Sequence, residues 1–233
     1  MKSVGALVSS VILIITVMLV ATPLLADTSR LPEDLQQKLD SLPDNATRIE
    51  LLQEELKKSP DDAALHFALG NLYLDENKSQ AAADEFEATT KLDPDFLGGW
   101  VNLGNAQDDL GQLDQALKSY SQALKLAPTD EKALCNLGGV YFKKREIGRA
   151  LDAFQTAIEH HPDSQLAHYN MAILFADAQV YREARREWEK VVEVDPHSDL
   201  GERSAANIKI IEDLMKTEAP QLPDPKEKDA SGR

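Results

Sequence analysis

The segment WVNLGNAQDDLGQLDQALKSYSQALKLAPTD, residues 100–130, contains two successive runs of apolar residues spaced by three and four. Such spacing is typical of a helix that buries one face. The runs are separated near Gly111, a residue that suits the left-handed end of a helix. The second run is closed by Pro128, because proline cannot continue a helix. The segment therefore predicts two helices joined by a tight turn.

The same pattern recurs along the chain with a period of 34 residues. The period is marked by Pro60, Pro94, Pro128, Pro162 and Pro196. One column of the aligned repeats holds only small residues, namely Gly70, Gly104, Gly138 and Ala172. Another holds bulky ones, namely Phe86, Tyr120, Phe154 and Trp188. A small residue lets a bulky neighbour seat against its backbone, so these columns predict closely nested helix pairs.

A second segment, ALCNLGGVYFKKREIGRALDAFQTAIEHHPDS at residues 133–164, repeats these features. Both segments resemble the tetratricopeptide repeat along their whole length. The resemblance covers four units, residues 63–96, 97–130, 131–164 and 165–198. It implies an all-α fold, a right-handed α-solenoid of helix-turn-helix repeats. It does not identify a partner.

The exposed ends of such an array need cover. Residues 199–216 predict a C-terminal capping helix, with Ala205, Ile208, Ile211 and Leu214 on one face. Residues 27–62 predict a degenerate N-terminal repeat, with a turn at Pro43. Residues 217–233 contain almost nothing apolar, so they predict a disordered tail.

Charge and cysteine content exclude several classes of function. The formal net charge is −15, and a surface of that sign repels nucleic acid. Anionic lipid is repelled for the same reason. A single cysteine, Cys135, cannot form an internal disulfide, and no zinc or haem spacing is present. We therefore expect neither a nucleic-acid partner nor a cofactor.

The N-terminus contains an uncharged, strongly apolar stretch from residue 3 to 26, preceded by Lys2. One interpretation is a signal peptide of residues 1–26 that is cleaved after Ala26. The other is an uncleaved membrane anchor, since the stretch is long enough to span a bilayer. Both predict export, to the periplasm or to the inner membrane with the repeats facing the periplasm. Membrane contact is expected only through this segment.

Stacked helix pairs curve, and by resemblance to the family the first helix of each unit lines the concave side. The predicted partner-binding groove comprises Phe67, Asn71, Leu74, Val101, Asn105, Lys132, Cys135, Phe142, Leu166 and Tyr169. Its apolar stripe fits an extended or helical peptide segment anchored by aromatics. The alternative is that neighbouring helices or one of the chain's own tails cover the stripe.

Chaperone-binding relatives grip a C-terminal carboxylate with two lysines, two asparagines and an arginine. Here Asn71, Asn102 and Lys132 match that set. Phe67 stands in place of one lysine and Asn136 in place of the arginine. Two of three cationic donors are missing, so we expect no such clamp.

No catalytic motif is present in the sequence, whether HExxH, GxSxG, a phosphate loop or a dinucleotide fingerprint. His66 and His168 occupy a packing column, so they are interpreted as half-buried fillers rather than metal ligands. No cation is expected to activate the thiol of Cys135. We therefore predict no catalytic residue, no metal site and no enzymatic activity.

The predicted function is a non-enzymatic scaffold of the cell envelope that binds another protein or peptide segment through the concave groove. It would act in the assembly of an envelope complex. The alternative is a self-associating structural protein, a homo-oligomer that stacks through its ends or its groove. The two differ in whether sedimentation depends on concentration.

Overall fold

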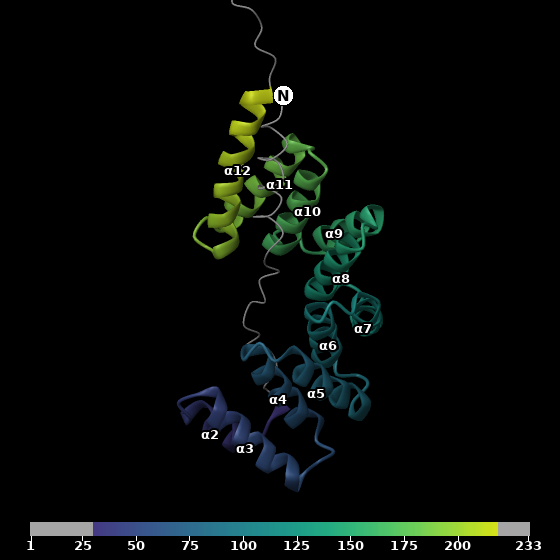
Figure 1. Cartoon of the computed structure of the whole chain (residues 1–233), viewed down its shortest axis with the longest axis vertical. Helices are drawn as coiled ribbons and strands as arrows, with labels where there is room; N and C mark the ends of the chain where they lie inside the picture. Colours follow the sequence, from purple (N-terminus) through teal and green to yellow (C-terminus); the bar gives the residue numbers. More distant parts are fainter. Residues whose placement is uncertain (1–29, 219–233) are drawn as a thin grey trace, which may run out of the picture. The chain divides into compact units, whose positions relative to one another are not determined.

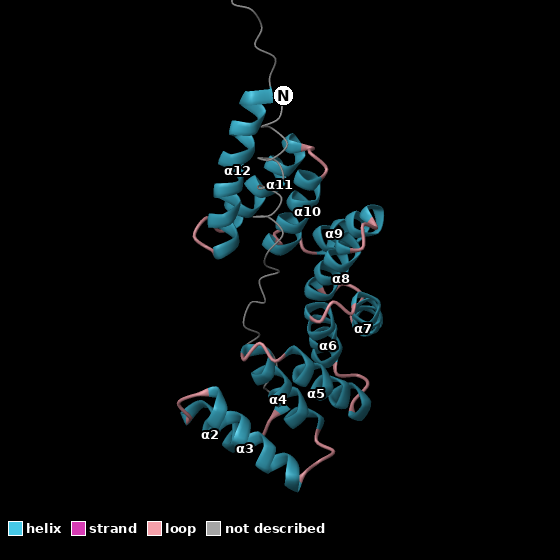
Figure 2. Cartoon of the chain, viewed as in Figure 1, coloured by secondary structure: helices cyan, strands magenta, loops and turns pink. Residues whose placement is uncertain are grey.

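The computed structural model describes residues 30–218, and every regular element in that range is an α-helix (Figure 2). The elements are α2 (Glu33–Ser41), α3 (Asn45–Lys58), α4 (Ala63–Asp75), α5 (Ser79–Leu92), α6 (Leu97–Asp109), α7 (Leu113–Leu126), α8 (Glu131–Lys143), α9 (Ile147–His160), α10 (Gln165–Asp177), α11 (Tyr181–Val194) and α12 (Asp199–Glu218). Among these described helices, none has the length and apolarity needed to cross a membrane. The predicted signal peptide or anchor lies outside the described residues, as does the tail from residue 219.

The described part of the chain divides into two compact units, with the boundary between residues 167 and 168. In the first unit, α4 pairs with α5, α6 with α7 and α8 with α9 (Figure 1). The second helix of each pair also packs on the first helix of the next pair, so α5 contacts α6 and α7 contacts α8. This alternation produces the stacked helix pairs that the 34-residue period predicts.

The small and bulky columns meet at the seam inside each pair. A Cβ atom added to Gly104 would lie 2.5 Å from Cε1 of Tyr120, far closer than real side chains approach. Gly138 stands in the same relation to Phe154, at 2.5 Å, and Gly70 to Phe86, at 2.7 Å. The predicted nesting of a bulky ring on a glycine backbone is therefore confirmed in three pairs.

The turn inside each pair places one residue in the left-handed backbone region. These residues are Asn77, Gly111, Arg145 and Gln179, with φ between 56° and 71°. In the second pair, the backbone N–H of Gly111 donates to Asp108 and that of Gln112 donates to Gln107. These bonds satisfy carbonyl groups at the end of α6 that its own helix leaves without partners. The break that the sequence predicts is thus a tight, hydrogen-bonded helix terminus.

Three of the helices begin at an aspartate that caps the free backbone N–H groups. Asp130 accepts a hydrogen bond from Ala133 N at 2.8 Å, and Asp62 accepts from Ala64 N at 2.9 Å. Asp44 accepts from Thr47 N at 2.9 Å. The negative charge also suits the positive end of the helix dipole.

We expect Asp130→Ala to lower the free energy of unfolding by about 1 kcal/mol, because the amide of Ala133 loses its acceptor. Asp130→Asn should retain most of that stability, since asparagine caps helices about as well. Urea unfolding of both variants, followed by circular dichroism, measures the difference. Equal losses in the two variants would contradict a capping role.

The N-terminal helices cover the first repeat. Leu39 of α2 and Leu52 of α3 are buried in one cluster with Leu65 and Leu69 of α4. Leu31, which precedes α2, is buried in the same cluster. Helices α2 and α3 therefore pack on the first helix of the first repeat, and Pro43 lies in the turn between them.

The second unit is built around Trp188 of α11, which is fully buried. It packs with Ala172 and Ala176 of α10 and with Ile211 of α12. The capping helix expected at 199–216 is α12, and it continues to Glu218, two residues beyond the predicted end. Residues 217 and 218 are therefore helical rather than part of the predicted tail.

Candidate partner-binding surface

A row of asparagine amides runs along the first helices of the first unit. Asn102 Nδ2 donates to Asn71 Oδ1 at 2.7 Å, and Asn136 Nδ2 donates to Asn105 Oδ1 at 2.8 Å. Asn105 Nδ2 donates to Asn102 Oδ1 at 3.4 Å and joins the two pairs. The hydroxyl of Tyr120 donates to Asn105 Oδ1 at 2.8 Å. These four asparagines, here called the asparagine row, thus connect α4, α6 and α8 and are braced from α7.

The asparagine row is partly accessible, and the side-chain nitrogen of Asn71 is buried without an acceptor in the described part of the chain. Asn71, Asn105 and Asn136 are half-exposed, whereas Asn102 is buried. Lys132 of α8 is exposed on the same set of first helices. Amide side chains both donate and accept hydrogen bonds, so they can pair with a peptide backbone of any sequence. The sequence analysis places Asn71 and Asn105 in the groove and compares Asn102 and Asn136 with the carboxylate clamp, but it does not predict the continuous row.

Three residues of the predicted groove lie inside the helix stack instead of on its surface. Phe67, Val101 and Cys135 have exposed fractions of 1%, 5% and 0%. The ring of Phe67 packs against those of Phe86 and Phe96, with centroids 5.7 Å and 4.6 Å apart. A partner cannot touch these side chains unless the helices separate.

Burial also determines the chemistry of Cys135. Desolvation raises the pKa of its thiol far above the ordinary range, and nearby Glu131 and Asp130 raise it further. The thiol therefore stays protonated at neutral pH. A protonated thiol is a poor nucleophile.

The remaining predicted groove residues of the first unit keep partial or full exposure. Asn71, Leu74, Asn105, Phe142 and Leu166 are half-exposed and Lys132 is exposed. Tyr169 belongs to the second unit, where it packs with Ile173 and Ile208. Burial raises the pKa of its hydroxyl, while hydrogen bonds with Asn207 and Arg203 of α12 oppose that rise. Tyr169 is thus partly covered by the chain's own capping helix.

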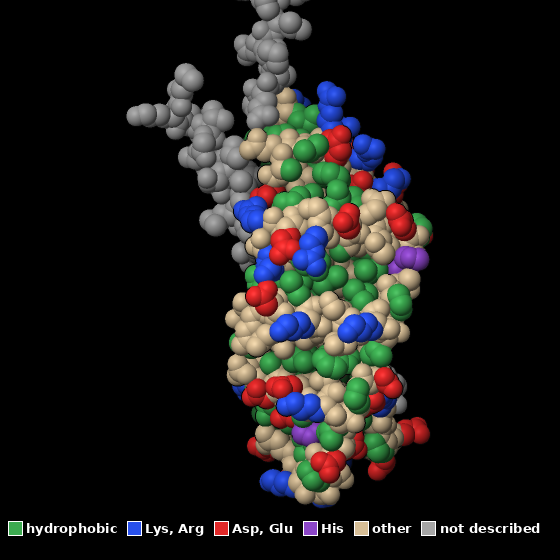
Figure 3. Space-filling model, turned by 90° about the vertical axis from the view of Figure 1, so that its right-hand side faces the viewer, with side chains coloured by type: hydrophobic (Ala, Val, Ile, Leu, Met, Phe, Trp, Pro, Cys, Tyr) green, Lys and Arg blue, Asp and Glu red, His purple; other side chains and the backbone are tan. Residues whose placement is uncertain are grey.

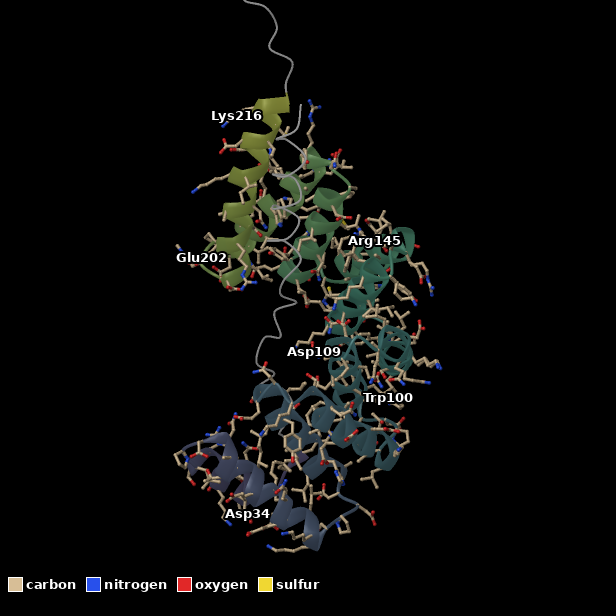
Figure 4. The ribbon with its side chains drawn as sticks, in the orientation of Figure 1. Asp34, Trp100, Asp109, Arg145, Glu202 and Lys216 are labelled. Atoms are coloured by element: carbon tan, nitrogen blue, oxygen red, sulfur yellow. The ribbon has the colours of Figure 1, made fainter. Side chains whose placement is uncertain are left out.

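An ion pair between two repeats lies beside the asparagine row. Lys143 Nζ of α8 donates to Asp108 Oδ2 of α6 at 2.7 Å, and the Asp108 side chain is 3% exposed. Neighbouring Asp109, labelled in Figure 4, has its pKa raised by burial and by the charge of Asp108. The pair fixes α6 against α8. It places a largely buried charge close to the accessible amides.

The start of the first repeat is covered by the N-terminal segment. Arg30 Nη1 donates to Asp93 Oδ2 at 2.7 Å, and its guanidinium lies 3.9 Å from the ring centroid of Phe96. Arg30, Asp93 and Phe96 line an open hollow of about 570 Å³ together with the loop around Pro60. The N-terminal segment therefore contacts the start of α4 and the loop that precedes α6.

The histidines in the packing column form contacts inside their own repeats. His66 Nδ1 lies 2.6 Å from Glu85 Oε2, and its Nε2 lies 2.9 Å from the carbonyl oxygen of Pro60. At the equivalent position, Trp100 Nε1 donates to the carbonyl of Pro94 at 2.8 Å. These contacts support the interpretation of His66 as a packing residue. Within residues 30–218, no group of three or more His, Cys, Asp or Glu could hold a metal ion.

Charged side chains of both signs are spread over the face of the molecule shown in Figure 3. Hydrophobic side chains are interspersed among them in small groups. A surface of this kind is well hydrated.

The comparisons with known proteins identify the repeats. The tetratricopeptide repeat family matches residues 49–95 and 135–199, and a related family described as TPR repeat matches residues 109–145. A TPR repeat-containing protein of Pseudomonas aeruginosa is 38% identical over 52 residues, which is 22% of this chain. The chain spans half the length of that curated relative. The chain therefore contains tetratricopeptide repeats.

Solved structures show the same fold. MamA from Desulfovibrio magneticus RS-1 aligns with a TM-score of 0.64 and 20% identity, covering 75% of this chain and 98% of its own. TTC0263, a thermophilic TPR protein from Thermus thermophilus, aligns with a TM-score of 0.62 and 23% identity, over 74% and 95%. YrrB, described as a TPR protein with an unusual peptide-binding site, gives 0.58 and 20%, over 74% and 88%. The predicted fold class, an all-α solenoid of tetratricopeptide helix pairs with a capping helix, is confirmed.

Proposed function

We propose that this chain is a protein-binding scaffold of the cell envelope that holds a segment of another protein along the first helices of its repeats. The observation that carries the proposal is the asparagine row on α4, α6 and α8. Its amides lie on three successive helices and offer hydrogen bonds to a ligand that runs across them. An extended peptide presents main-chain donors and acceptors along its length and suits such a row.

The accessible groove residues supply the rest of the recognition. Leu74 and Phe142 are half-exposed apolar side chains on α4 and α8, and Lys132 adds one exposed cation. An apolar contact at each end with amides between them favours a segment of mixed polarity over a purely hydrophobic one. The peptide-binding site attributed to YrrB makes such a use of the fold reasonable.

Export is proposed from the sequence. The uncharged stretch from residue 3 to 26 supports either a signal peptide or a membrane anchor, and both direct the repeats out of the cytoplasm. We propose a role in assembly of an envelope complex on this ground. N-terminal sequencing of the protein purified from cells distinguishes cleavage from anchoring.

Site-specific photocross-linking tests the proposed binding face. A photoreactive residue at Lys132, on the first helix α8, is expected to give adducts with a partner protein in intact cells. The matched control is Lys125, an equally charged and exposed residue on the second helix α7. Equal labelling from both positions, or labelling only from Lys125, would exclude the first-helix face.

Self-association is the alternative that the same experiment detects. Adducts at twice the mass of the chain would identify a second copy as the partner. Sedimentation of the purified full chain over a range of concentrations then checks it. A constant monomer would remove the self-assembly interpretation.

A further inference from the structure

A second hollow, of about 490 Å³, lies between α5 and α7 on the side of the first unit formed by the second helices. Its lining includes Trp100, Leu103 and Gln107 of α6, and Ser119 of α7. Trp100 is half-exposed and is labelled in Figure 4. This α5–α7 hollow is separate from the asparagine row, and nothing in the proposed function uses it.

The hollow coincides with a departure from the repeat pattern. Gln107 stands at the position where the neighbouring repeats have Tyr73 and Tyr141, each 34 residues away. Tyr141 is buried and Tyr73 is half-buried, so both rings are used in packing. The repeat that contains Gln107 therefore lacks one aromatic ring that its neighbours on both sides possess.

The neighbouring repeats show where the missing ring would lie. Gln53 Nε2 donates to the hydroxyl of Tyr73 at 3.0 Å, and the residue equivalent to Gln53 in the next repeat is Glu87. The guanidinium of Arg149 lies 4.0 Å from the ring centroid of Tyr141. The residue equivalent to Arg149 in the preceding repeat is Gln115.

Glu87 and Gln115 both line the α5–α7 hollow. A tyrosine at position 107 would therefore project into this hollow, between α5 and α7. Gln107 leaves the space open because its side chain turns to its own helix pair, where Oε1 accepts a hydrogen bond from Ser119 Oγ at 2.7 Å.

We propose that the α5–α7 hollow is a binding site for an aromatic side chain of a protein partner, a tyrosine above all, which takes the place of the missing ring. The inference rests on the proposed function only in that the ring comes from a protein. The ring would lie against Trp100 and Leu103, which provide the apolar contact that aromatic side chains need.

The groups around the hollow favour a phenol over other side chains. The carboxylate of Glu87, at the place where Gln53 meets the hydroxyl of Tyr73, can accept a hydrogen bond from a phenol. Lys91 Nζ already forms an ion pair with Oε1 of Glu87 at 2.7 Å. A carboxylate on the ligand would therefore meet a cation whose charge Glu87 already neutralises. The lining of α6 is uncharged, and an ionised ligand group would be desolvated there without compensation.

Fluorine NMR of the full chain labelled with 5-fluorotryptophan tests the proposal. The chain has two tryptophans, Trp100 in the hollow and the fully buried Trp188, which serves as an internal reference. Titration with N-acetyl-tyrosinamide is expected to shift the Trp100 resonance and leave that of Trp188 unchanged. N-acetyl-alaninamide at the same concentration should shift neither.

Two substitutions, one expected to weaken probe binding and one expected to strengthen it, sharpen the test. Gln107→Tyr fills the hollow from within and should weaken probe binding at least tenfold, with Gln37→Tyr on α2 as the matched control. Gln115→Arg, at an exposed position, adds the guanidinium that covers Tyr141 in the next repeat. It should strengthen binding about two- to fivefold through a cation–π contact.

A Trp100 resonance that does not respond to the probe would overturn the inference. So would equal responses in the unmodified chain, Gln107→Tyr and Gln115→Arg. If circular dichroism shows that Gln107→Tyr is misfolded, the Gln115→Arg result decides alone. The probe needs no partner, so this outcome is independent of the cross-linking at Lys132.

Discussion

Replacing Trp188 with alanine is expected to lower the free energy of unfolding of the second unit by about 3–5 kcal/mol. The side chain is fully buried between α10, α11 and α12. Three of its neighbours, Ala172, Ala176 and Ala184, are too small to fill the space that the indole would leave. The loss therefore includes both the transfer of a large apolar surface and an unfilled cavity.

Hydrogen exchange of the α11 amides, followed by mass spectrometry, reports the stability of this unit separately from the first. Trp188→Phe should cost less than Trp188→Ala, because the phenyl ring keeps most of the volume. The Trp188→Phe substitution also removes the indole N–H, which has no hydrogen-bond acceptor within the described residues. Ile210→Ala, at a 37% exposed position of α12, is the control and should change stability by about 0.5 kcal/mol or less. A loss at Trp188 no greater than this control would contradict the described core.

Substituting Gly104 with alanine is expected to destabilise the first unit by about 1–3 kcal/mol. Helix propensity alone predicts the opposite sign, since alanine is favoured over glycine by about 1 kcal/mol inside a helix. Steric overlap prevails because the new methyl group would lie 2.5 Å from the ring of Tyr120, which is fully buried and cannot move aside. Urea unfolding monitored by circular dichroism measures the change.

A double-mutant cycle isolates this contact. Tyr120→Leu removes the ring and should relieve the overlap, so Gly104→Ala should cost less in that background than alone. Gly148→Ala on α9 is the matched control, because its added methyl would meet no atom within 4 Å. It is expected to be neutral or slightly stabilising. Additive losses in the cycle would contradict the nesting of Tyr120 on Gly104.

The sequence predicts the helix pairs well because their steric requirements recur with a fixed period. A glycine backbone facing a buried ring, as at Gly138 and Phe154, restricts both positions to few residue types. The left-handed turn residue and the following proline add separate boundaries to each pair. Several independent restraints therefore agree on the same helix ends.

The candidate site is less predictable because exposure depends on residues outside the repeat column. Phe67 occupies a groove position, yet Phe96 covers it and Gly98 allows a close approach, with an added Cβ 3.1 Å from the Phe67 ring. Both neighbours are visible in the sequence, but no consensus assigns them to this contact. The contact of Arg30 with Asp93 and that of Tyr169 with α12 could not be predicted either, because one partner in each lies beyond the repeats.

The four left-handed turn residues are chemically unrelated: an asparagine, a glycine, an arginine and a glutamine. A residue with a Cβ atom loses about 1–2 kcal/mol in this conformation. Glycine avoids that loss but surrenders roughly 0.5–1 kcal/mol of additional chain entropy on folding. The two penalties partly offset each other, so exchanging glycine for another residue at this position of each repeat changes stability by about 1.5 kcal/mol at most. Sequence drift there can alter the charge along that edge of the molecule, as Arg145 does, while the helix pairing stays the same.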